Sequence, residues 1–408
     1  MSGPYTIFDV VIAGGGVNGL ALAAAIKQAM RQGVSVAVVD PGAPPAASAT
    51  PLRTVAIAEG PRRLLEQIGA WEATAPKAQP ILSMAIMDGD VRDAVRLPHL
   101  HFGSKDRAPL AYMAFNDDVV DALSALCDRL EVDRITASVA DWASGKRVAE
   151  IRLSDGRVLR ARLAVAADGA RSKLSRLADI QTIGWDYDQT GMVATVAHER
   201  DHEGRAEQHF LPAGPFAILP LPGRQSSIVW NESRADAGAL LALDPEDLTR
   251  ELEYRFTPKL GAIRLVSRVE GFPFRFQIAR RFVAERLALV GDAAHVVHPV
   301  AGQGLNLGLR DVAALAETVV AEMRLGLDPG APAPLAAYQR RRRFDVAASG
   351  LGLDALNRLF SNDHAPLRFA RDLGLRVLDR APMLKDMLIA EAGGAGSRAP
   401  KLLKGFAL

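Results

Sequence analysis

The sequence lacks the features of an extracellular, membrane-spanning or cysteine-dependent protein. A single cysteine among 408 residues, Cys127, excludes an internal disulfide bond and a metal site built from cysteines. No apolar run approaches the roughly 20 residues that a membrane-spanning helix needs. The N-terminus also lacks the layout of a signal peptide. We therefore expect a cytoplasmic protein in which Cys127 is a small, buried, apolar side chain.

Neither sign of charge dominates the composition. The chain has 49 Lys and Arg against 47 Asp and Glu, which gives a formal net charge of +2. This balance gives no reason to expect a nucleic acid or another strongly charged macromolecule as a partner. The one dense basic run, 340–343, is most simply a solvated helix face. With 49% hydrophobic residues, the chain can bury a sizeable core in one large or two to three ordinary domains.

The first 40 residues predict a βαβ unit. Residues 7–14 form a β-branched run that ends in glycines, 17–31 have apolar residues at helical spacing, and 34–40 are again β-branched. Such a unit sets its two strands in parallel and lays the helix on one face of the sheet. The junction between the first strand and the helix is therefore the place to look for a ligand.

That junction carries a dinucleotide-binding pattern. The spacing is Gly14-x-Gly16-x-x-Gly19. Gly14 permits a tight turn, Gly16 lets the backbone approach a diphosphate, and Gly19 lets the helix pack on the strand. The diphosphate would lie at the positive helix N-terminus. Asp40 ends the next strand, where an acid can accept hydrogen bonds from a ribose, so the pattern favours FAD or NAD.

Two later strands are each predicted to end in an acid. The stretch "RLAVAADG" ends at Asp168-Gly169, and "RLALVGD" ends at Asp292. Ligands of open parallel sheets bind at the carboxyl ends of the strands, where the Asp292 carboxylate would lie. An Asp-Gly turn after a strand is common, however, so Asp168 gains meaning only from its context.

The stretch after Asp292 allows either a metal site or a cofactor pocket. His295 and His298 are three residues apart, which is not the spacing of a helical metal pair. Gly302 and Gly304 predict a flexible loop, and from Leu305 the apolar residues follow helical spacing. The N-terminus of that helix would stabilise negative charge. We interpret the two histidines as packing residues and expect no metal.

The remaining chain alternates between two kinds of pattern. Residues 81–97 and 191–233 resemble antiparallel strands with Pro and Gly turns, whereas 117–130 predicts a helix. Beyond residue 304 the pattern is helical almost to the end. The chain is thus predicted to leave a βαβ domain for a β-rich one and to return, twice.

These motifs, in this order, resemble those of a known family. The chain is similar to the FAD-dependent aromatic hydroxylases of the para-hydroxybenzoate hydroxylase type, and most closely to the ubiquinone-biosynthesis hydroxylases. The likeness rests on the N-terminal GxGxxG, the central Asp-Gly and "GDAAHVVHPVAGQGLNLGLRDVAAL". It extends to "HFLPAGPFAILPL" and "ARRFVAERLALVGD" and covers nearly the whole chain.

The resemblance implies a role for individual residues. Arg53 matches an Arg beside the flavin's diphosphate or ribityl side, and Asp168 matches an acid associated with both FAD and nicotinamide. Asp292 matches the acid that holds the ribityl chain or diphosphate. Two positions depart from the family pattern: Asp40 stands where Glu is more usual, and Ser175 stands where an Arg is frequent.

The implied site therefore combines the glycine-rich turn with several later segments. The flavin-facing residues expected from the resemblance are Pro299, Gly302, Gln303 and Gly304. The full set expected to bind FAD is Gly14, Gly16, Val17, Asn18, Gly19, Asp40, Arg53, Asp168, Gly169, Asp292, Pro299, Gly302, Gly304, Leu305 and Asn306.

The resemblance also implies an α/β fold with interleaved domains. A Rossmann-like FAD-binding domain of the GR2 type would comprise 1–75, 101–178 and 272–330. A β-sheet substrate domain would comprise 76–100 and 179–271. A C-terminal helical region would follow over 331–408.

The implied function is hydroxylation of an aromatic ring. The substrate would be a polyprenylated phenol or quinol of ubiquinone biosynthesis, with FAD as cofactor, NAD(P)H and O₂ as co-substrates, and a flavin hydroperoxide as the oxygen donor. Two alternatives remain: hydroxylation of a small soluble aromatic, or a non-catalytic flavin-binding scaffold of a quinone-synthesis complex. The stretch "AGPFAILPLPG" either lines the substrate site or is an ordinary core strand. The basic and apolar segment from 367 suggests a peripheral contact with the inner membrane or with such a complex.

Overall fold

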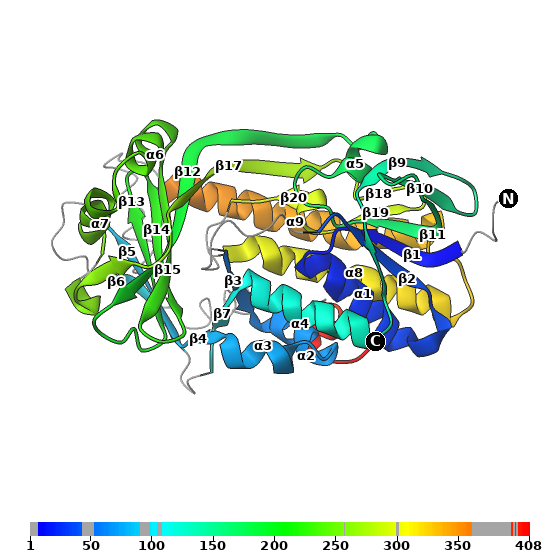
Figure 1. Cartoon of the computed structure of the whole chain (residues 1–408), viewed down its shortest axis with the longest axis horizontal. Helices are drawn as coiled ribbons and strands as arrows, with labels where there is room; N and C mark the ends of the chain where they lie inside the picture. Colours follow the sequence, from blue (N-terminus) through cyan, green and yellow to red (C-terminus); the bar gives the residue numbers. More distant parts are fainter. Residues whose placement is uncertain are drawn as a thin grey trace.

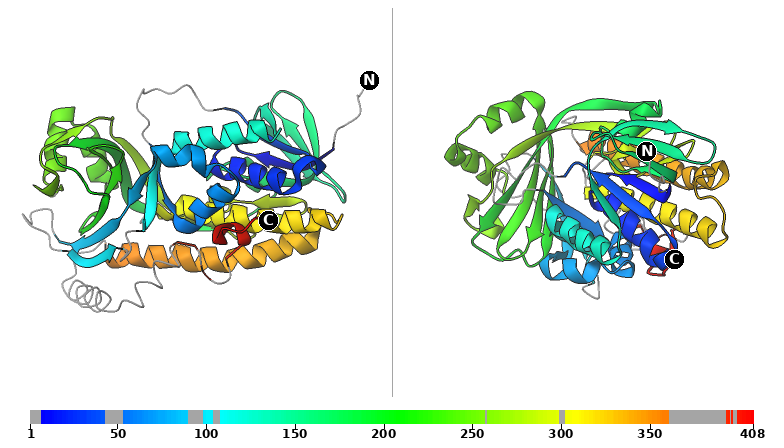
Figure 2. Two further views of the ribbon diagram at one scale, coloured as in Figure 1. Left: turned by 90° about the horizontal axis from the view of Figure 1, so that it is seen from below. Right: turned by 45° about the vertical axis from the view of Figure 1, so that its right-hand side comes forward.

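The computed structural model has two lobes joined by long elements (Figure 1). It describes residues 7–42, 53–89, 98–103, 108–256, 258–298, 302–360, 393–394, 396 and 399–408. One lobe is built on an eight-stranded sheet and the other on a nine-stranded sheet. The strands β12 (Thr182–His198) and β17 (Glu270–Ala279) run from one lobe to the other, as does helix α9 (Pro332–Phe360) (Figures 1 and 2).

The eight-stranded sheet has a parallel centre. Its main strand order is β18-β19-β11-β1-β2-β8, with β10 and β9 attached to β11. The neighbours β2, β1, β11 and β19 all run parallel. Their carboxyl ends therefore meet at one edge. The strands are β1 (Ile7–Ala13), β2 (Val36–Asp40), β8 (Asp133–Thr136), β9 (Val139–Ser144), β10 (Ala149–Leu153), β11 (Val158–Ala166), β18 (Val283–Ala284) and β19 (Leu287–Leu289).

Helix α1 (Val17–Met30) is buried on all sides at its centre. Every residue over 20–26 is at most 2% exposed, because α1 packs between the sheet, α4 (Asn116–Arg129) and α8 (Gln303–Arg324). Four alanines in this stretch allow that close approach. Cys127 of α4 is fully buried against α1, with its Sγ 3.5 Å from the Leu20 carbonyl, so the prediction of a buried thiol is confirmed.

The nine-stranded sheet is mostly antiparallel. Its main order is β20-β17-β12-β15-β14-β13-β5-β6, with β16 paired to β12. The pair β5 and β13 is parallel, in contrast to the antiparallel pattern expected for 81–97. The further strands are β5 (Ser83–Asp88), β6 (Pro98–Gly103), β13 (Arg205–Leu211), β14 (Gly214–Leu221), β15 (Gln225–Ser233), β16 (Ile263–Leu265) and β20 (His295–Val296).

The two faces of the nine-stranded sheet have different partners. On the outer face, Phe216 and Ile218 of β14 belong to a core covered by α6 (Arg234–Leu241) and α7 (Pro245–Glu253). On the inner face, Leu219 and Leu221 pack with residues of a three-stranded sheet in the order β3-β7-β4. Successive side chains of the stretch "AGPFAILPLPG" thus point alternately to the outer and the inner face. The strands of the small sheet are β3 (Thr54–Ala58), β4 (Gln79–Ile81) and β7 (Ala111–Phe115).

Shorter elements connect these sheets and helices. Helix α2 (Glu59–Gln67) and α3 (Trp71–Thr74) follow β3, and α5 (Lys173–Leu177) follows β11. The 3₁₀ turn η4 (Gly291–Ala293) follows β19, and η6 (Lys401–Lys404) packs on α2 near the C-terminus.

The strands continue past the domain boundaries that the sequence suggested. Strand β17 pairs with β12 as far as residue 279, beyond the boundary expected at 271. The β4 strand, expected in the β-rich domain, pairs with β7. Strand β19 ends at residue 289, so Asp292 lies in the following turn and not at the strand end. No described helix is both long and apolar enough to cross a membrane.

Candidate cofactor site

The glycine-rich turn lies where β1 meets α1, at the carboxyl edge of the parallel strands. Gly14 has φ +114°, a conformation that favours glycine. A Cβ there would lie 2.2 Å from the Ala167 carbonyl oxygen, and a Cβ at Gly19 would lie 1.9 Å from the Gly14 oxygen. A Cβ at Gly16, in contrast, would meet no protein atom within 4 Å. The first and third glycines therefore allow close packing, and the second leaves the helix N-terminus open to a ligand.

Asp40 stands beside this turn at the end of β2. Its Oδ2 accepts a hydrogen bond from the Gly15 N–H at 2.6 Å, and its Oδ1 accepts one from the Gly42 N–H at 2.8 Å. The carboxylate thus fixes the glycine turn directly. Each oxygen has a further lone pair with which to accept a hydrogen bond from a ribose hydroxyl.

Asp168 and Gly169 follow the neighbouring strand β11. Asp168 Oδ2 accepts the Lys173 N–H at 2.7 Å and so satisfies a backbone donor at the start of α5. Its Oδ1 is buried and has no hydrogen-bond partner among the described residues. Gly169 has φ +81° and open space where a Cβ would lie. The motif therefore keeps one carboxylate oxygen available at the sheet edge.

Asp292 lies in η4, after the next parallel strand. Its side chain is half-buried and accepts no hydrogen bond within the described ranges. The preceding Gly291 has φ +60°, and a Cβ there would lie 2.2 Å from Asn18 Nδ2. A Cβ at Gly308 of α8 would lie 2.5 Å from the same nitrogen. Asn18 therefore packs between η4 and α8 in the first turn of α1, where Val17 is buried.

The start of α8 is attached to the three-stranded sheet. Gly302 caps the helix in the left-handed conformation, with φ +62°, and a Cβ there would lie 3.0 Å from Ala56 Cβ. Asn306 accepts the Ala58 N–H at 3.0 Å and donates to the carbonyls of Ala56, at 2.9 Å, and Gly302, at 3.1 Å. One buried amide thus joins α8 to β3.

The other residues expected beside the flavin occupy the same region. Gln303, Gly304 and Leu305 form the first turn of α8 and are half-buried. Arg53 directly precedes β3 and is exposed. Pro299 lies outside the described residues. Figure 1 shows the N-terminal end of α8 turned toward the nine-stranded sheet.

A buried charge network supports the turn that carries Asp292. Asp311 of α8 accepts hydrogen bonds from His295 Nε2 at 2.6 Å, Arg342 Nε at 2.6 Å and the Gly291 N–H at 2.9 Å. Burial alone would raise the pKa of Asp311, but its interactions with His295 and Arg342 hold that pKa below its usual value. Arg342 is 3% exposed. The solvated face expected for 340–343 is therefore wrong at this one position, because the buried Asp311 requires a cation.

His298 lies in an aromatic cluster and not in a metal site. Its ring meets those of Tyr187 and Phe274 edge-on, at centroid distances of 5.0 and 4.7 Å. Tyr187 donates its hydroxyl hydrogen to Asp354 of α9 at 2.6 Å. Burial lowers the pKa of His298 to about 4, so the ring is neutral at physiological pH. Across the described ranges, no three His, Cys, Asp or Glu side chains form a metal-binding group.

The residues present fit an FAD molecule. The open position at Gly16 and the positive N-terminus of α1 suit a diphosphate, and Asp40 suits a ribose. Asp168 Oδ1 and the Asp292 carboxylate are two acceptors at the same edge that have no partners among the described residues. The N-terminus of α8 would stabilise negative charge on the ring system. Together, the parallel sheet and this edge define a dinucleotide-dependent oxidoreductase that carries a second, β-rich lobe.

Comparisons with known proteins identify the family. The FAD binding domain family matches residues 8–348. The chain is 44% identical to ubiquinone hydroxylase UbiL of Rhodospirillum rubrum, with 100% of this chain and 96% of the relative aligned. It is 34% identical to 3-demethoxyubiquinol 3-hydroxylase of Escherichia coli, over 95% and 98% of the two chains. The chain belongs to this family of FAD-dependent aromatic hydroxylases, which use NAD(P)H and O₂.

Solved structures give the same fold. PqsL of Pseudomonas aeruginosa, in complex with 2-aminobenzoylacetate, superimposes with a TM-score of 0.76 at 25% identity and covers 90% of this chain and 100% of its own. The p-nitrophenol 4-monooxygenase PnpA of Pseudomonas putida has a TM-score of 0.78 at 20% identity, over 96% and 100%. The predicted FAD cofactor and mixed α/β fold are thus confirmed.

Proposed function

We propose that this protein hydroxylates the aromatic ring of a polyprenylated phenol or quinol intermediate of ubiquinone biosynthesis. The balanced reaction consumes one ring C–H, NAD(P)H, a proton and O₂, and forms the ring C–OH, NAD(P)⁺ and water. The observation that carries the proposal is the 44% identity, over the whole chain, to a ubiquinone hydroxylase. FAD, held by the glycine-rich turn and by Asp40, Asp168 and Asp292, would supply the redox chemistry and O₂ activation that the protein side chains cannot provide.

The protein's own part is to orient the ring, exclude water and stabilise charge. The helix N-terminus at Gln303 and Gly304 is fixed on β3 through Asn306, so its N–H groups are held in place before reaction. The inner face of the nine-stranded sheet packs against the same small sheet, so an apolar wall and the start of α8 share this sheet as a neighbour. Such a wall supports chemistry that water would intercept.

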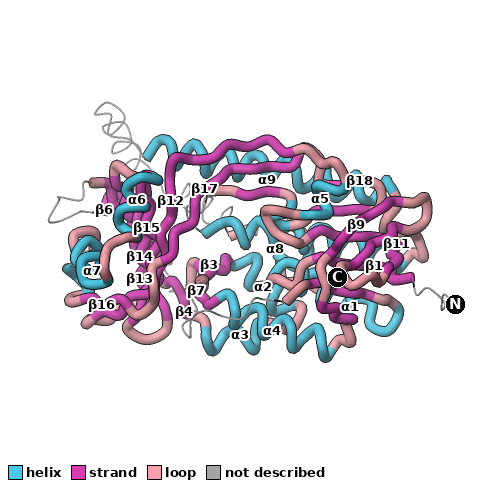
Figure 3. Tube along the Cα trace, turned by 45° about the horizontal axis from the view of Figure 1, so that its top comes forward, coloured by secondary structure: helices cyan, strands magenta, loops and turns pink. Residues whose placement is uncertain are grey.

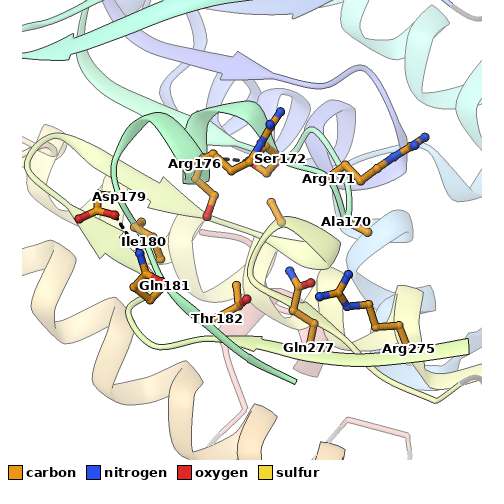
Figure 4. A pocket seen from close by; sticks show the side chains of 12 residues that line it. Ala170, Arg171, Ser172, Arg176, Asp179, Ile180, Gln181, Thr182, Arg275 and Gln277 are labelled. Carbon is orange, nitrogen blue, oxygen red and sulfur yellow. Dashed lines mark hydrogen bonds between the residues drawn. The ribbon is translucent and has the colours of Figure 1, made fainter. Parts of the chain in front are cut away.

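A pocket beside Asp168 suits the second nucleotide. This cavity of about 470 Å³ lies between α5, the start of β12 and β17 (Figure 4). Arg171, Arg176 and Arg275 line it, together with Ser175. Figure 4 shows Arg275 and Gln277 rising from β17 toward α5. Guanidinium groups bind phosphate well, so the pocket offers cations for NAD(P)H although Ser175 replaces the Arg frequent in the family.

The exposed side of α9 suits a lipid surface. Phe344, Leu351 and Leu359 are 81, 54 and 40% exposed and lie on one side of the helix. Arg340 and Arg343 are exposed beside Phe344. Apolar residues flanked by arginines favour the interface of an anionic bilayer, where a prenylated substrate would also partition. The segment for which the sequence suggested membrane contact, from 367, lies almost wholly outside the described residues.

Vesicle flotation tests this surface. The chain should float with vesicles that contain anionic lipid, and Phe344→Ser with Leu351→Ser should abolish flotation. Tyr254→Ser, which removes another exposed aromatic at the C-terminal end of α7, is the matched control. Flotation that survives the double substitution would place the contact elsewhere.

Turnover with matched substrates tests the function. Purified holoenzyme is given an octaprenyl phenol or a simple phenol, and NAD(P)H oxidation is followed together with the product mass. A gain of one oxygen on the prenylated ring alone supports the proposal. A gain on the simple phenol alone points to a soluble aromatic, and a yellow protein that hydroxylates neither points to the scaffold. Complementation of strains blocked at each ubiquinone hydroxylation step then identifies the intermediate.

A further inference from the structure

The inner face of the nine-stranded sheet is the face turned toward β3 and β7. Gln208, Ala217, Val229 and Val193 are cross-strand partners in one row, so their side chains point to this same side. Phe210, Pro215 and Asn231 form the next row by the same register. The face therefore carries two amides, from β13 and β15, among apolar side chains.

This face adjoins the flavin-facing helix terminus. Ser227 Oγ lies 2.8 Å from Thr54 Oγ1 of β3. Leu219 packs in one cluster with Ala56, the residue against which Gly302 is packed. The start of α8 and the inner face thus share the same small sheet as a neighbour, as Figures 1 and 3 show.

The two amides have hydrogen-bonding atoms without partners. Asn231 is 4% exposed and its Oδ1 is unbonded, and Gln208 is 8% exposed and its Nε2 is unbonded, within the described part of the chain. Thr195 Oγ1, in the row of Ser227, is also buried without a hydrogen-bond partner. Buried polar atoms are normally satisfied, because an unsatisfied one costs about 1–3 kcal/mol. Two such amides on one apolar face require an explanation.

A neighbouring amide shows that the sheet can satisfy such groups. Gln189 lies on the same side of β12, donates to the Ala213 carbonyl at 3.0 Å and accepts from Asn357 of α9 at 3.0 Å. Both the nitrogen and the oxygen of its amide therefore have hydrogen-bond partners within the protein. Asn231 and Gln208 differ from Gln189 because they leave an acceptor and a donor, respectively, for something else.

The surroundings select a neutral partner. Within β13, β14 and β15 the inner face carries no charged side chain. The neighbouring strand β5 adds a charged residue, Asp88, which lies opposite Phe210 and is acidic. A carboxylated ring would therefore find no cation on these described strands, and burying an unpaired charge is costly. A ring that bears only hydroxyl, alkoxy or carbonyl oxygens would meet an apolar wall with one donor and one acceptor.

We propose that Asn231 and Gln208 bind two ring oxygens of the aromatic substrate. Asn231 Oδ1 accepts a hydrogen bond from a ring hydroxyl, and Gln208 Nε2 donates one to a second ring oxygen. The two positions are two strands and two residues apart, which corresponds to roughly 12 Å between their Cα atoms. An oxygen-substituted ring between the two side chains can bridge that span. This inference rests on the proposed function, and it makes the ring oxygens the specificity determinant.

Apolar variants of similar shape test the proposal in the holoenzyme. Asn231→Leu and Gln208→Met remove the amides, and Gln189→Met is the matched control. The probes are a prenylated methoxyphenol and two counterparts that lack either the hydroxyl or the methoxy oxygen. Binding is measured from the perturbation of the flavin absorbance, and hydroxylation from product mass.

The wild-type protein should bind the complete ring about tenfold or more tightly than either counterpart. Asn231→Leu should lose the preference for the hydroxyl alone, and Gln208→Met the preference for the methoxy oxygen alone. The melting temperature of both apo-variants should stay equal or rise, because each loses an unsatisfied polar atom. Gln189→Met should keep both preferences.

Other results separate this proposal from the proposed function. Preferences that persist in both variants, with normal hydroxylation, would overturn the role of the amides and leave the function intact. A fall in melting temperature in both variants, with unchanged preferences, would assign the amides to structure and overturn it equally. A wild-type protein that binds the three rings alike would also overturn it. A wild-type protein that binds them selectively but oxygenates none would overturn the function alone.

Discussion

Asp311 and His295 are both fully buried and share a hydrogen bond of 2.6 Å between carboxylate and imidazole. The same carboxylate accepts from Arg342 of α9 and from the Gly291 N–H of the turn that carries Asp292. One acid of α8 therefore joins two segments that are separate in the sequence, residues 291–295 and α9.

Asp311→Asn should destabilise the protein by about 3–5 kcal/mol, because Arg342 loses its fully buried carboxylate partner and keeps only the half-buried Asp345. FAD affinity should fall as well, since the Gly291 turn loses its acceptor. Urea unfolding and FAD titration measure the two effects. Glu150→Gln, which breaks an exposed pair with Arg160, serves as control and should cost less than about 1 kcal/mol. Equal losses in the two variants would contradict a supporting role for Asp311.

Substitutions at two glycines of the first turn should have different effects, one on cofactor binding and the other on folding. Gly16→Val should abolish FAD binding and leave the apo-protein's melting temperature nearly unchanged, because its side chain would enter the open space at the helix N-terminus. Gly19→Val should instead lower the melting temperature strongly, since its Cβ would clash with the Gly14 oxygen. Retention of stoichiometric FAD in Gly16→Val would refute the assignment of this turn.

Asp292→Ala should weaken FAD binding about 10- to 100-fold, the effect of losing one or two charged hydrogen bonds, and should preserve the fold. Its carboxylate accepts no hydrogen bond from the described chain, so the protein itself loses little. Fluorescence titration of apo-protein with FAD measures the affinity, and circular dichroism checks the fold. An unchanged affinity would remove Asp292 from the site.

The sequence predicted the elements with local signals and missed those that depend on tertiary contacts. The βαβ unit over β1, α1 and β2 was recognisable because glycine spacing and β-branched runs are local patterns. The role of Arg342 was not, because it sits among three exposed arginines and is distinguished only by its buried partner Asp311. One signal was available: an Asp inside an apolar helical pattern requires a partner.

The residues that share the inner face of the sheet could not be predicted from the sequence either. Asn231 and Gln208 lie in different strands, and strand register decides that they face the same side. A one-residue shift would turn either amide to the outer core. The aromatic cluster around His298 likewise joins β12, β17 and α9, which no local pattern connects.

Arg275→Gln should raise the KM for NAD(P)H several-fold and leave FAD content unchanged, because the guanidinium lines the pocket beside α5 and not the glycine turn. The wild-type KM should also rise with ionic strength, and the variant's KM should rise less steeply. Steady-state kinetics at several salt concentrations measure both. Arg264→Gln, on β16 and not among the residues that line this pocket, is the control. A normal KM in Arg275→Gln would place the nucleotide elsewhere.

His298 should make the protein less stable in mild acid. Burial lowers the pKa of His298 from its usual 6.5 to about 4, so the unfolded chain binds a proton between these values that the folded chain does not. The free energy of unfolding should therefore fall by about 1.4 kcal/mol per pH unit, or about 3 kcal/mol in all, as the pH drops from 6.5 to 4. Acids with a lowered pKa, such as Asp311, lose their contribution at still lower pH. In His298→Gln the unfolding free energy should change less steeply with pH in this window, by an amount that corresponds to about one bound proton. This difference in slope does not depend on the variant's absolute stability. Urea unfolding at half-unit pH steps gives both slopes, and parallel slopes would show that His298 is protonated in the folded protein.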